Sequence, residues 1–150
     1  VYLLQHALQN VMRSGTGKSA CHYLPENLRV AGKTGTTNDY RDSWFAGFSG
    51  DYLGIVWLGL DDNGPMNLTG ATGALKVWTD FIKRIPQHSL SMIKPASISS
   101  QWVDTETGLR TDEKCRGADM IPVWGSVDHI DYQRCNSGFS SFGGWFKSWF

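Results

Sequence analysis

The chain has 150 residues, the size of one domain, and its apolar content of 41% is ordinary for a globular protein. Its 14 basic residues balance 14 acidic residues, so the formal net charge is +0 and there is no basic footprint for nucleic acid. No apolar run approaches the roughly 20 residues that span a bilayer. Because the chain begins inside an amphipathic pattern, without an initiator Met or a signal peptide, we expect it to be a fragment or the C-terminal part of a longer protein.

Residues 1–14 carry apolar side chains at helical spacing, and the glycines Gly15 and Gly17 stop the predicted amphipathic helix. The segment G-T-G-K-S at residues 15–19 has some features of a nucleotide-binding loop. Such a loop needs its first glycine at position 12, where this chain has Met12, and it needs a preceding strand. We therefore interpret the segment as a helix-to-strand connection.

Residues 28–36 form an apolar run that enters Lys33-Thr34-Gly35-Thr36, which is typical of a strand leading into a polar loop. With period-two alternation, Lys33 and Gly35 face one way, while Thr34 and Thr36 face the other. Because Gly35 has no side chain, an extended ligand fits against the strand and bonds to its peptide groups. The predicted surface combines an ammonium, two hydroxyls and a backbone N–H, which suits a carboxylate beside a carbonyl under attack.

Two further strands are predicted at residues 43–49 and 52–60, joined by a hairpin turn at Gly50-Asp51. The last strand is apolar on both faces, so both faces of the sheet need a cover. We expect one covering helix from residues 1–14 and another from the amphipathic pattern at residues 71–85. The predicted fold class is an α/β (α+β) sandwich, in which an antiparallel sheet is flanked by helices.

The chain changes character after Pro86, which ends the second predicted helix. Residues 61–70, before that helix, predict a loop by composition. Residues 87–100 are rich in Ser and predict a linker, and a small hairpin is expected within residues 102–111. The aromatic segment at residues 139–150 suits a partner or a membrane interface, although we favour a terminus that packs on its own domain.

Three cysteines, Cys21, Cys115 and Cys135, leave room for one disulfide and one free thiol. In an oxidising compartment we expect Cys115 to pair with Cys135, which closes a loop worth roughly 3 kcal/mol in the chain-entropy model. The alternative is zinc, because His129 lies between these two cysteines. Since the C-x13-H-x5-C spacing matches no familiar ligand set, we predict neither a metal nor a cofactor.

The segment V-A-G-K-T-G-T-T-N, followed by D-x-W-F-A-G, resembles the third active-site motif of the serine penicillin-binding proteins and its flank. K-T-G alone is a weak signal because three common residues recur by chance, whereas the extended match is much more specific. It is similar to the transpeptidase domain of the bifunctional class A penicillin-binding proteins, the 1B subgroup in particular. The residues in register in the flank are Asn38, Asp42, Trp44, Phe45, Ala46 and Gly47.

The resemblance implies acyl transfer, in which a serine attacks the D-Ala-D-Ala bond of a peptidoglycan stem peptide and a neighbouring amine resolves the acyl-enzyme. Carried over by position, Lys33 is catalytic and orients the anionic end of the substrate. Thr34 and Thr36 bind the terminal carboxylate. The N–H of Thr36, also catalytic, forms half of an oxyanion hole, a donor typically worth ~3 kcal/mol. Gly35 and Thr37 complete the substrate-binding strand.

Two further motifs of that family supply the nucleophile with its base, S-x-x-K, and a proton relay, S-x-N. S-x-N does not occur in this chain, and S-x-x-K occurs once, at residues 91–94. There it follows K-T-G, and Lys94 precedes Pro95, which disfavours the helix that the motif requires, so we attribute it to chance. We expect the nucleophile to lie upstream of Val1 and the isolated chain to be inactive.

By this resemblance, residues 1–86 are the C-terminal part of a transpeptidase domain with a penicillin-binding-protein/β-lactamase-like fold, and residues 87–150 are a linker and an irregular C-terminal extension. The whole protein would be a serine-type D,D-transpeptidase with an upstream glycosyltransferase domain and membrane anchor, on the periplasmic side of the bacterial inner membrane. The expected partners are peptidoglycan stem peptides, β-lactams and the N-terminal part of the same protein.

Other functions stay open at this point. The first is a non-catalytic binding module or an inactive remnant of the same fold. A β-lactamase or a D,D-carboxypeptidase belongs to the same superfamily, but the W-F-A-G strand and the long cysteine-bearing tail argue against it. Nucleotide binding is the most distant alternative.

Overall fold

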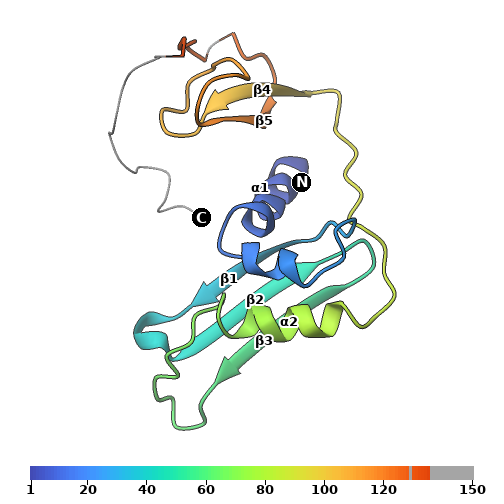
Figure 1. Ribbon diagram of the computed structural model, residues 1–150, viewed down its shortest axis with the longest axis vertical. Coiled ribbons are helices and arrows are strands. Elements are labelled where there is room, and N and C mark those ends of the chain that lie inside the picture. Colours follow the sequence, from blue (N-terminus) through green and yellow to red (C-terminus); the bar gives the residue numbers. More distant parts are fainter. Residues whose placement is uncertain (129, 136–150) are drawn as a thin grey trace. The chain divides into compact units, whose positions relative to one another are not determined.

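A computed structural model describes residues 1–128 and 130–135. The chain divides into two compact units, Leu3–Met92 and Ile93–Phe150. Figure 1 follows the elements along the chain, which are α1 (Tyr2–Arg13), η1 (Lys18–His22), β1 (Ala31–Thr36), η2 (Asn38–Tyr40), β2 (Asp42–Phe48), β3 (Leu53–Gly59) and α2 (Ala74–Ile82), then β4 (Ile98–Asp104) and β5 (Ala118–Trp124).

The first unit is built on an antiparallel sheet with the strand order β1-β2-β3, which confirms the predicted class of fold. The β2–β3 hairpin closes at the predicted turn, where the N–H of Ser49 donates to the carbonyl oxygen of Tyr52 (2.9 Å). Burial alternates along β2, with Phe45 fully buried and its neighbours Trp44 and Ala46 exposed. The sheet therefore has one face turned to the core and one turned away from it.

β1 is shorter than predicted and begins at Ala31 rather than at residue 28. Its partner strand β2 ends opposite Ala31, at Phe48, so the preceding backbone has no ladder to join. That backbone bonds to a later segment instead, where the N–H of Leu90 donates to the carbonyl oxygen of Arg29 (2.9 Å). The strand that carries K-T-G is thus tied to residues past α2.

Helix α2 packs across β2 and β3 because two glycines leave room for its tryptophan (Figure 1). The ring of Trp78 lies 5.0 Å from the ring of Phe45, edge to face. A Cβ atom on Gly47 or Gly54 would approach the indole to 2.9 Å, so a side chain at either position would push the helix away. The buried cluster on this face comprises Met12, Ala20, Leu24, Val30, Phe45, Ala74, Leu75, Trp78 and Ile82.

The opposite face of the sheet is exposed over the described residues. We call it the bare face and define it by Trp44, Leu53, Ile55 and Trp57, whose exposed fractions are 42%, 70%, 64% and 52%. The prediction that residues 1–14 cover this face is wrong, because Met12 of α1 packs into the same buried cluster as α2. An amphipathic pattern shows that a helix buries one side, but it does not select the face of the sheet that receives it.

The second unit holds an antiparallel pair, β4 and β5. The expected hairpin within residues 102–111 is present, since the N–H of Thr111 donates to the carbonyl oxygen of Trp102 (3.0 Å). The linker predicted at residues 87–100 ends early, because β4 already pairs with β5 from Ile98 onward. A disulfide joins Cys115 to Cys135, whose Cα atoms lie 5.2 Å apart.

Two features singled out from the sequence, His129 and the aromatic segment 139–150, lie outside the described residues. In the part that the structure describes, neither α1 nor α2 has the length and apolar character needed to cross a bilayer.

Candidate active site

The K-T-G residues lie on β1, which pairs with β2 along one side and with no other strand among the described residues. Opposite residues of an antiparallel pair share a face. Thr34 lies opposite the buried Phe45, so it belongs to the core face, and Gly35 lies opposite Trp44, so it belongs to the bare face. The strand therefore presents its threonine hydroxyls and its lysine on different faces of the sheet.

Thr36 is fixed by the loop that precedes α2. The N–H of Gly70 donates to Oγ1 of Thr36 (2.9 Å), which leaves the proton of the Thr36 hydroxyl free for another acceptor. The loop approaches so closely that a Cβ atom on Gly70 would lie 2.7 Å from the carbonyl oxygen of Gly35. A backbone contact of this kind requires glycine. The sequence placed Gly70 at the end of the predicted loop 61–70, before the second helix, and did not predict its hydrogen bond to Thr36.

Lys33 is exposed at the same edge. Its ammonium donates to the carbonyl oxygen of Thr34 (3.0 Å) and makes no ion pair with any carboxylate in the described part of the chain. An ammonium with donors to spare can meet an anionic ligand without first breaking a salt bridge.

The hydroxyl of Thr37 is used within the chain. The N–H of Asp42 donates to Oγ1 of Thr37 (2.8 Å), and that hydroxyl donates to the Asp42 carboxylate (3.1 Å). The other carboxylate oxygen accepts from Nε1 of Trp57 (2.8 Å). The structure thus places Thr37 in the closure of the β1–β2 connection rather than at the open strand edge.

The single S-x-x-K, Ser91 to Lys94, lies in irregular backbone rather than in a helix. Lys94 donates to Oγ of Ser100 (3.2 Å), and no hydrogen bond joins it to Ser91 among the described residues. The geometry of a nucleophile beside its base is therefore absent from this segment.

A set of potential metal ligands brings together Asp112, Cys115 and Cys135. Both sulfurs are joined in the disulfide, so neither is a thiolate that a metal ion would take. The remaining carboxylate of Asp112 accepts from the hydroxyl of Tyr132 (2.6 Å).

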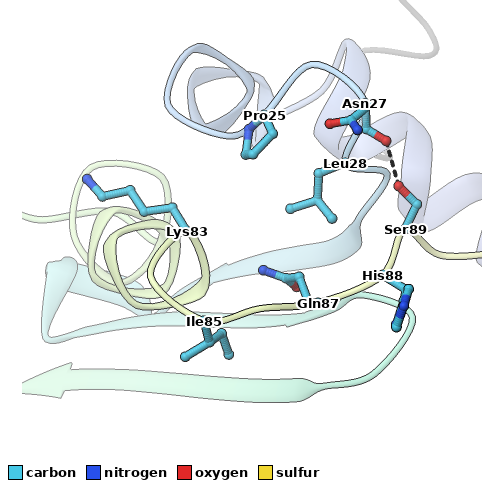
Figure 2. Close-up of a pocket in the computed structure, with 8 residues that line it drawn as sticks. All are labelled: Pro25, Asn27, Leu28, Lys83, Ile85, Gln87, His88 and Ser89. Atoms are coloured by element: carbon cyan, nitrogen blue, oxygen red, sulfur yellow. Dashed lines mark hydrogen bonds between the residues drawn. The ribbon is translucent and has the colours of Figure 1, made fainter.

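Two cavities lie among the described residues of the first unit, and the K-T-G residues line neither of them. One, of about 300 Å³, is lined by Pro25, Leu28, Lys83 and Gln87 among others, and Figure 2 shows it between the loop before β1 and the segment after α2. The second, of about 570 Å³, lies beside α1 and the residues before β1.

No family model matches the chain. Among curated proteins it is similar to penicillin-binding protein 1B of Vibrio cholerae, with 39% identity over 88% of this chain and 17% of that protein. It is 36% identical to penicillin-binding protein 1B of Escherichia coli over 83% of this chain and 14% of that protein. Among solved structures, penicillin-binding protein 1A from Haemophilus influenzae matches with a TM-score of 0.66 and 25% identity, over 89% of this chain and 21% of that chain.

The chain spans less than a fifth of the length of these curated relatives. The similarity extends over most of the chain in sequence and in structure, and it includes the antiparallel sheet that carries K-T-G. The chain belongs to the family of class A penicillin-binding proteins.

Proposed function

We propose that the chain is the C-terminal half of a D,D-transpeptidase domain and supplies the substrate-anchoring side of its active site. The observation that carries the proposal is the open edge of β1, where Lys33 and the hydroxyl of Thr36 each keep a donor for a ligand. A peptide ending in a carboxylate would take these donors, since hydrogen bonds to an ionised acceptor are roughly twice as strong as those between neutral groups.

In the proposed reaction a serine upstream of Val1 attacks the carbonyl carbon of the penultimate D-Ala. The peptide C–N bond breaks, and the terminal D-Ala leaves with a proton. An amine of a second stem peptide then attacks the acyl-serine, and the serine hydroxyl is restored. Lys33 would attract the terminal carboxylate, and the N–H of Thr36 would stabilise the oxyanion.

The remainder of the protein would supply what the chain lacks. We assign residues 1–86 to the transpeptidase domain and residues 87–150 to its C-terminal extension. The upstream part would bring the nucleophile, a glycosyltransferase domain and a membrane anchor, and the reaction would take place on the periplasmic side of the inner membrane. The bare face supports a further segment that packs on the sheet, because four large apolar side chains on one sheet face need a cover.

A non-catalytic module is the second candidate, favoured by the irregular backbone at Ser91–Lys94. Labelling with a fluorescent penicillin separates the two. The full-length protein should form a covalent adduct, Lys33→Ala should slow its formation at least a hundredfold, and the isolated 150 residues should take no label. A full-length protein that stays unlabelled would favour the non-catalytic module.

A further inference from the structure

A threonine outside the K-T-G motif reaches the proposed site. Thr16, in the loop between α1 and η1, has its Oγ1 atom 2.7 Å from Oγ1 of Thr34. The two residues are 18 positions apart, and their hydroxyls form a direct hydrogen bond. Thr16 is exposed and Thr34 is half-buried, so the pair lies at the surface of the strand.

The loop holds Thr16 firmly, because the glycines on either side fold back onto the end of α1. The N–H of Gly17 donates to the carbonyl oxygen of Val11 (2.9 Å), and the N–H of Gly15 donates to that of Asn10 (3.0 Å). A Cβ atom on Gly15 would lie 2.9 Å from the Cα atom of Val11, so the contact is too close for a side chain. Val11 is itself buried. Thr16 is thus carried by a loop fixed to a packed helix.

The hydrogen bond decides where the proton of Thr34 points. Each hydroxyl has one proton and two lone pairs, and the bond between two hydroxyls uses one of the two protons. A carboxylate is an acceptor only, so Thr34 can donate to it only if Thr16 supplies the proton of the hydroxyl pair. In that arrangement the Thr16 hydroxyl donates to Thr34, and Thr34 donates outward.

We propose that Thr16 is a positioning residue of the transpeptidase site, which orients the Thr34 hydroxyl toward the terminal carboxylate of the substrate. This inference rests on the proposed function of the β1 edge. It assigns the G-T-G segment a part in substrate binding beyond its role as a connection between α1 and β1. Because Thr16 acts through Thr34, its removal weakens carboxylate recognition and leaves the attack on the carbonyl otherwise intact.

The test measures the second-order rate of acylation of the full-length protein by a labelled penicillin. Thr16→Val keeps the branched shape and removes the hydroxyl, and it should slow acylation roughly fivefold, as a single neutral hydrogen bond would. Thr16→Ser should restore most of the rate. Ser14→Ala is the matched control, because the Ser14 hydroxyl sits in the same loop and, among the described residues, donates to the carbonyl oxygen of Asn10 (3.3 Å) rather than to β1.

Two further readouts separate positioning from packing. With the methyl ester of the same penicillin, which has no carboxylate, Thr16→Val and the unmodified protein should react at equal rates. In a cycle with Thr34→Val, the double variant should be no slower than Thr34→Val alone. An equal loss with acid and ester, or additive losses in the cycle, would overturn the role of Thr16.

The outcomes also distinguish this inference from the proposal on which it rests. If Lys33→Ala slows acylation and Thr16→Val does not, the site stands and the role of Thr16 is refuted. If Lys33→Ala is labelled as fast as the unmodified protein, the assignment of the β1 edge fails and the role of Thr16 fails with it. A loss that Thr16→Ser shares with Thr16→Val would show that the hydroxyl alone does not restore the rate, which also refutes positioning by the hydroxyl.

Discussion

Substitution of Gly70 tests the link between the loop before α2 and the K-T-G strand. In Gly70→Ala, the added Cβ atom would lie 2.6 Å from the carbonyl oxygen of Trp44 and 2.7 and 2.8 Å from the carbonyl oxygen and nitrogen of Gly35. These are backbone atoms of a paired ladder, so they cannot rotate away as a side chain can. The loop must retreat instead, and the N–H of Gly70 moves out of reach of Thr36.

The expected cost follows from two contributions. Overpacking against a rigid neighbour typically costs about 1–3 kcal/mol. The lost hydrogen bond between Gly70 and Thr36 adds about 1 kcal/mol. We therefore expect Gly70→Ala to destabilise the domain by about 2–4 kcal/mol, which corresponds to a fall of roughly 5–15 °C in its unfolding midpoint.

The assay follows the temperature at which the full-length protein loses its capacity to react with labelled penicillin. Gly64→Ala is the control, because a Cβ atom there would meet only the flexible carboxylate of Asp62, at 3.0 Å. Below the midpoint, Gly70→Ala should also react about tenfold more slowly, since the Thr36 hydroxyl has lost the donor that orients it. If Gly70→Ala and Gly64→Ala behave alike in both measurements, the proposed support of Thr36 by Gly70 is refuted.

Three other substitutions test separate features. Cys115→Ser breaks the disulfide and should raise the proteolytic susceptibility of residues 93–135 by about 100-fold, as a loss of about 3 kcal/mol in the free energy of unfolding implies. Cys21 is an exposed free cysteine, so Cys21→Ser should have no effect. The backbone N–H and imidazole of His88 hold the pKa of Asp51 below its ordinary value of 3.8, so their contact should persist above that pH and be lost as the pH falls through the lowered pKa. Hydrogen exchange of the Gly50 amide, which donates to His88, should accelerate there, and Asp51→Asn should abolish that step. Ile55→Ser should reduce the binding of a hydrophobic dye to the isolated chain, in which Ile55 is exposed, and should destabilise the full-length protein by about 1.5–3 kcal/mol if the bare face is covered there. An unchanged stability of the full-length protein would contradict that cover.

The local parts of the fold were predictable from the sequence. The hairpin turn at Gly50-Asp51, the helices and the alternation along β1 depend on residues close together in the chain, and periodicity reports such residues directly. The K-T-G strand was found for the same reason. Its start moved from residue 28 to Ala31, because β2 ends at Phe48, opposite Ala31.

The remaining features depend on contacts between distant residues, which no local pattern encodes. Gly70 bonds to Thr36 across 34 positions and Thr16 bonds to Thr34 across 18. β5 was not predicted because Pro122 lies within it, and a proline is tolerated only in a strand that has a free edge. The sequence also could not predict which face of the sheet α1 covers, since both faces of β3 are apolar.

The carboxylate of Asp42 accepts from the indole of Trp57 with one oxygen and from the hydroxyl of Thr37 with the other. A single carboxylate therefore links Trp57 on the bare face to the loop that follows β1. When another segment buries Trp57, it also shields this carboxylate from water, and both bonds strengthen as the local dielectric falls. We expect such a contact to stiffen the loop that follows Thr36. Slower amide exchange at Asp42 in the full-length protein than in the isolated chain would reveal this coupling.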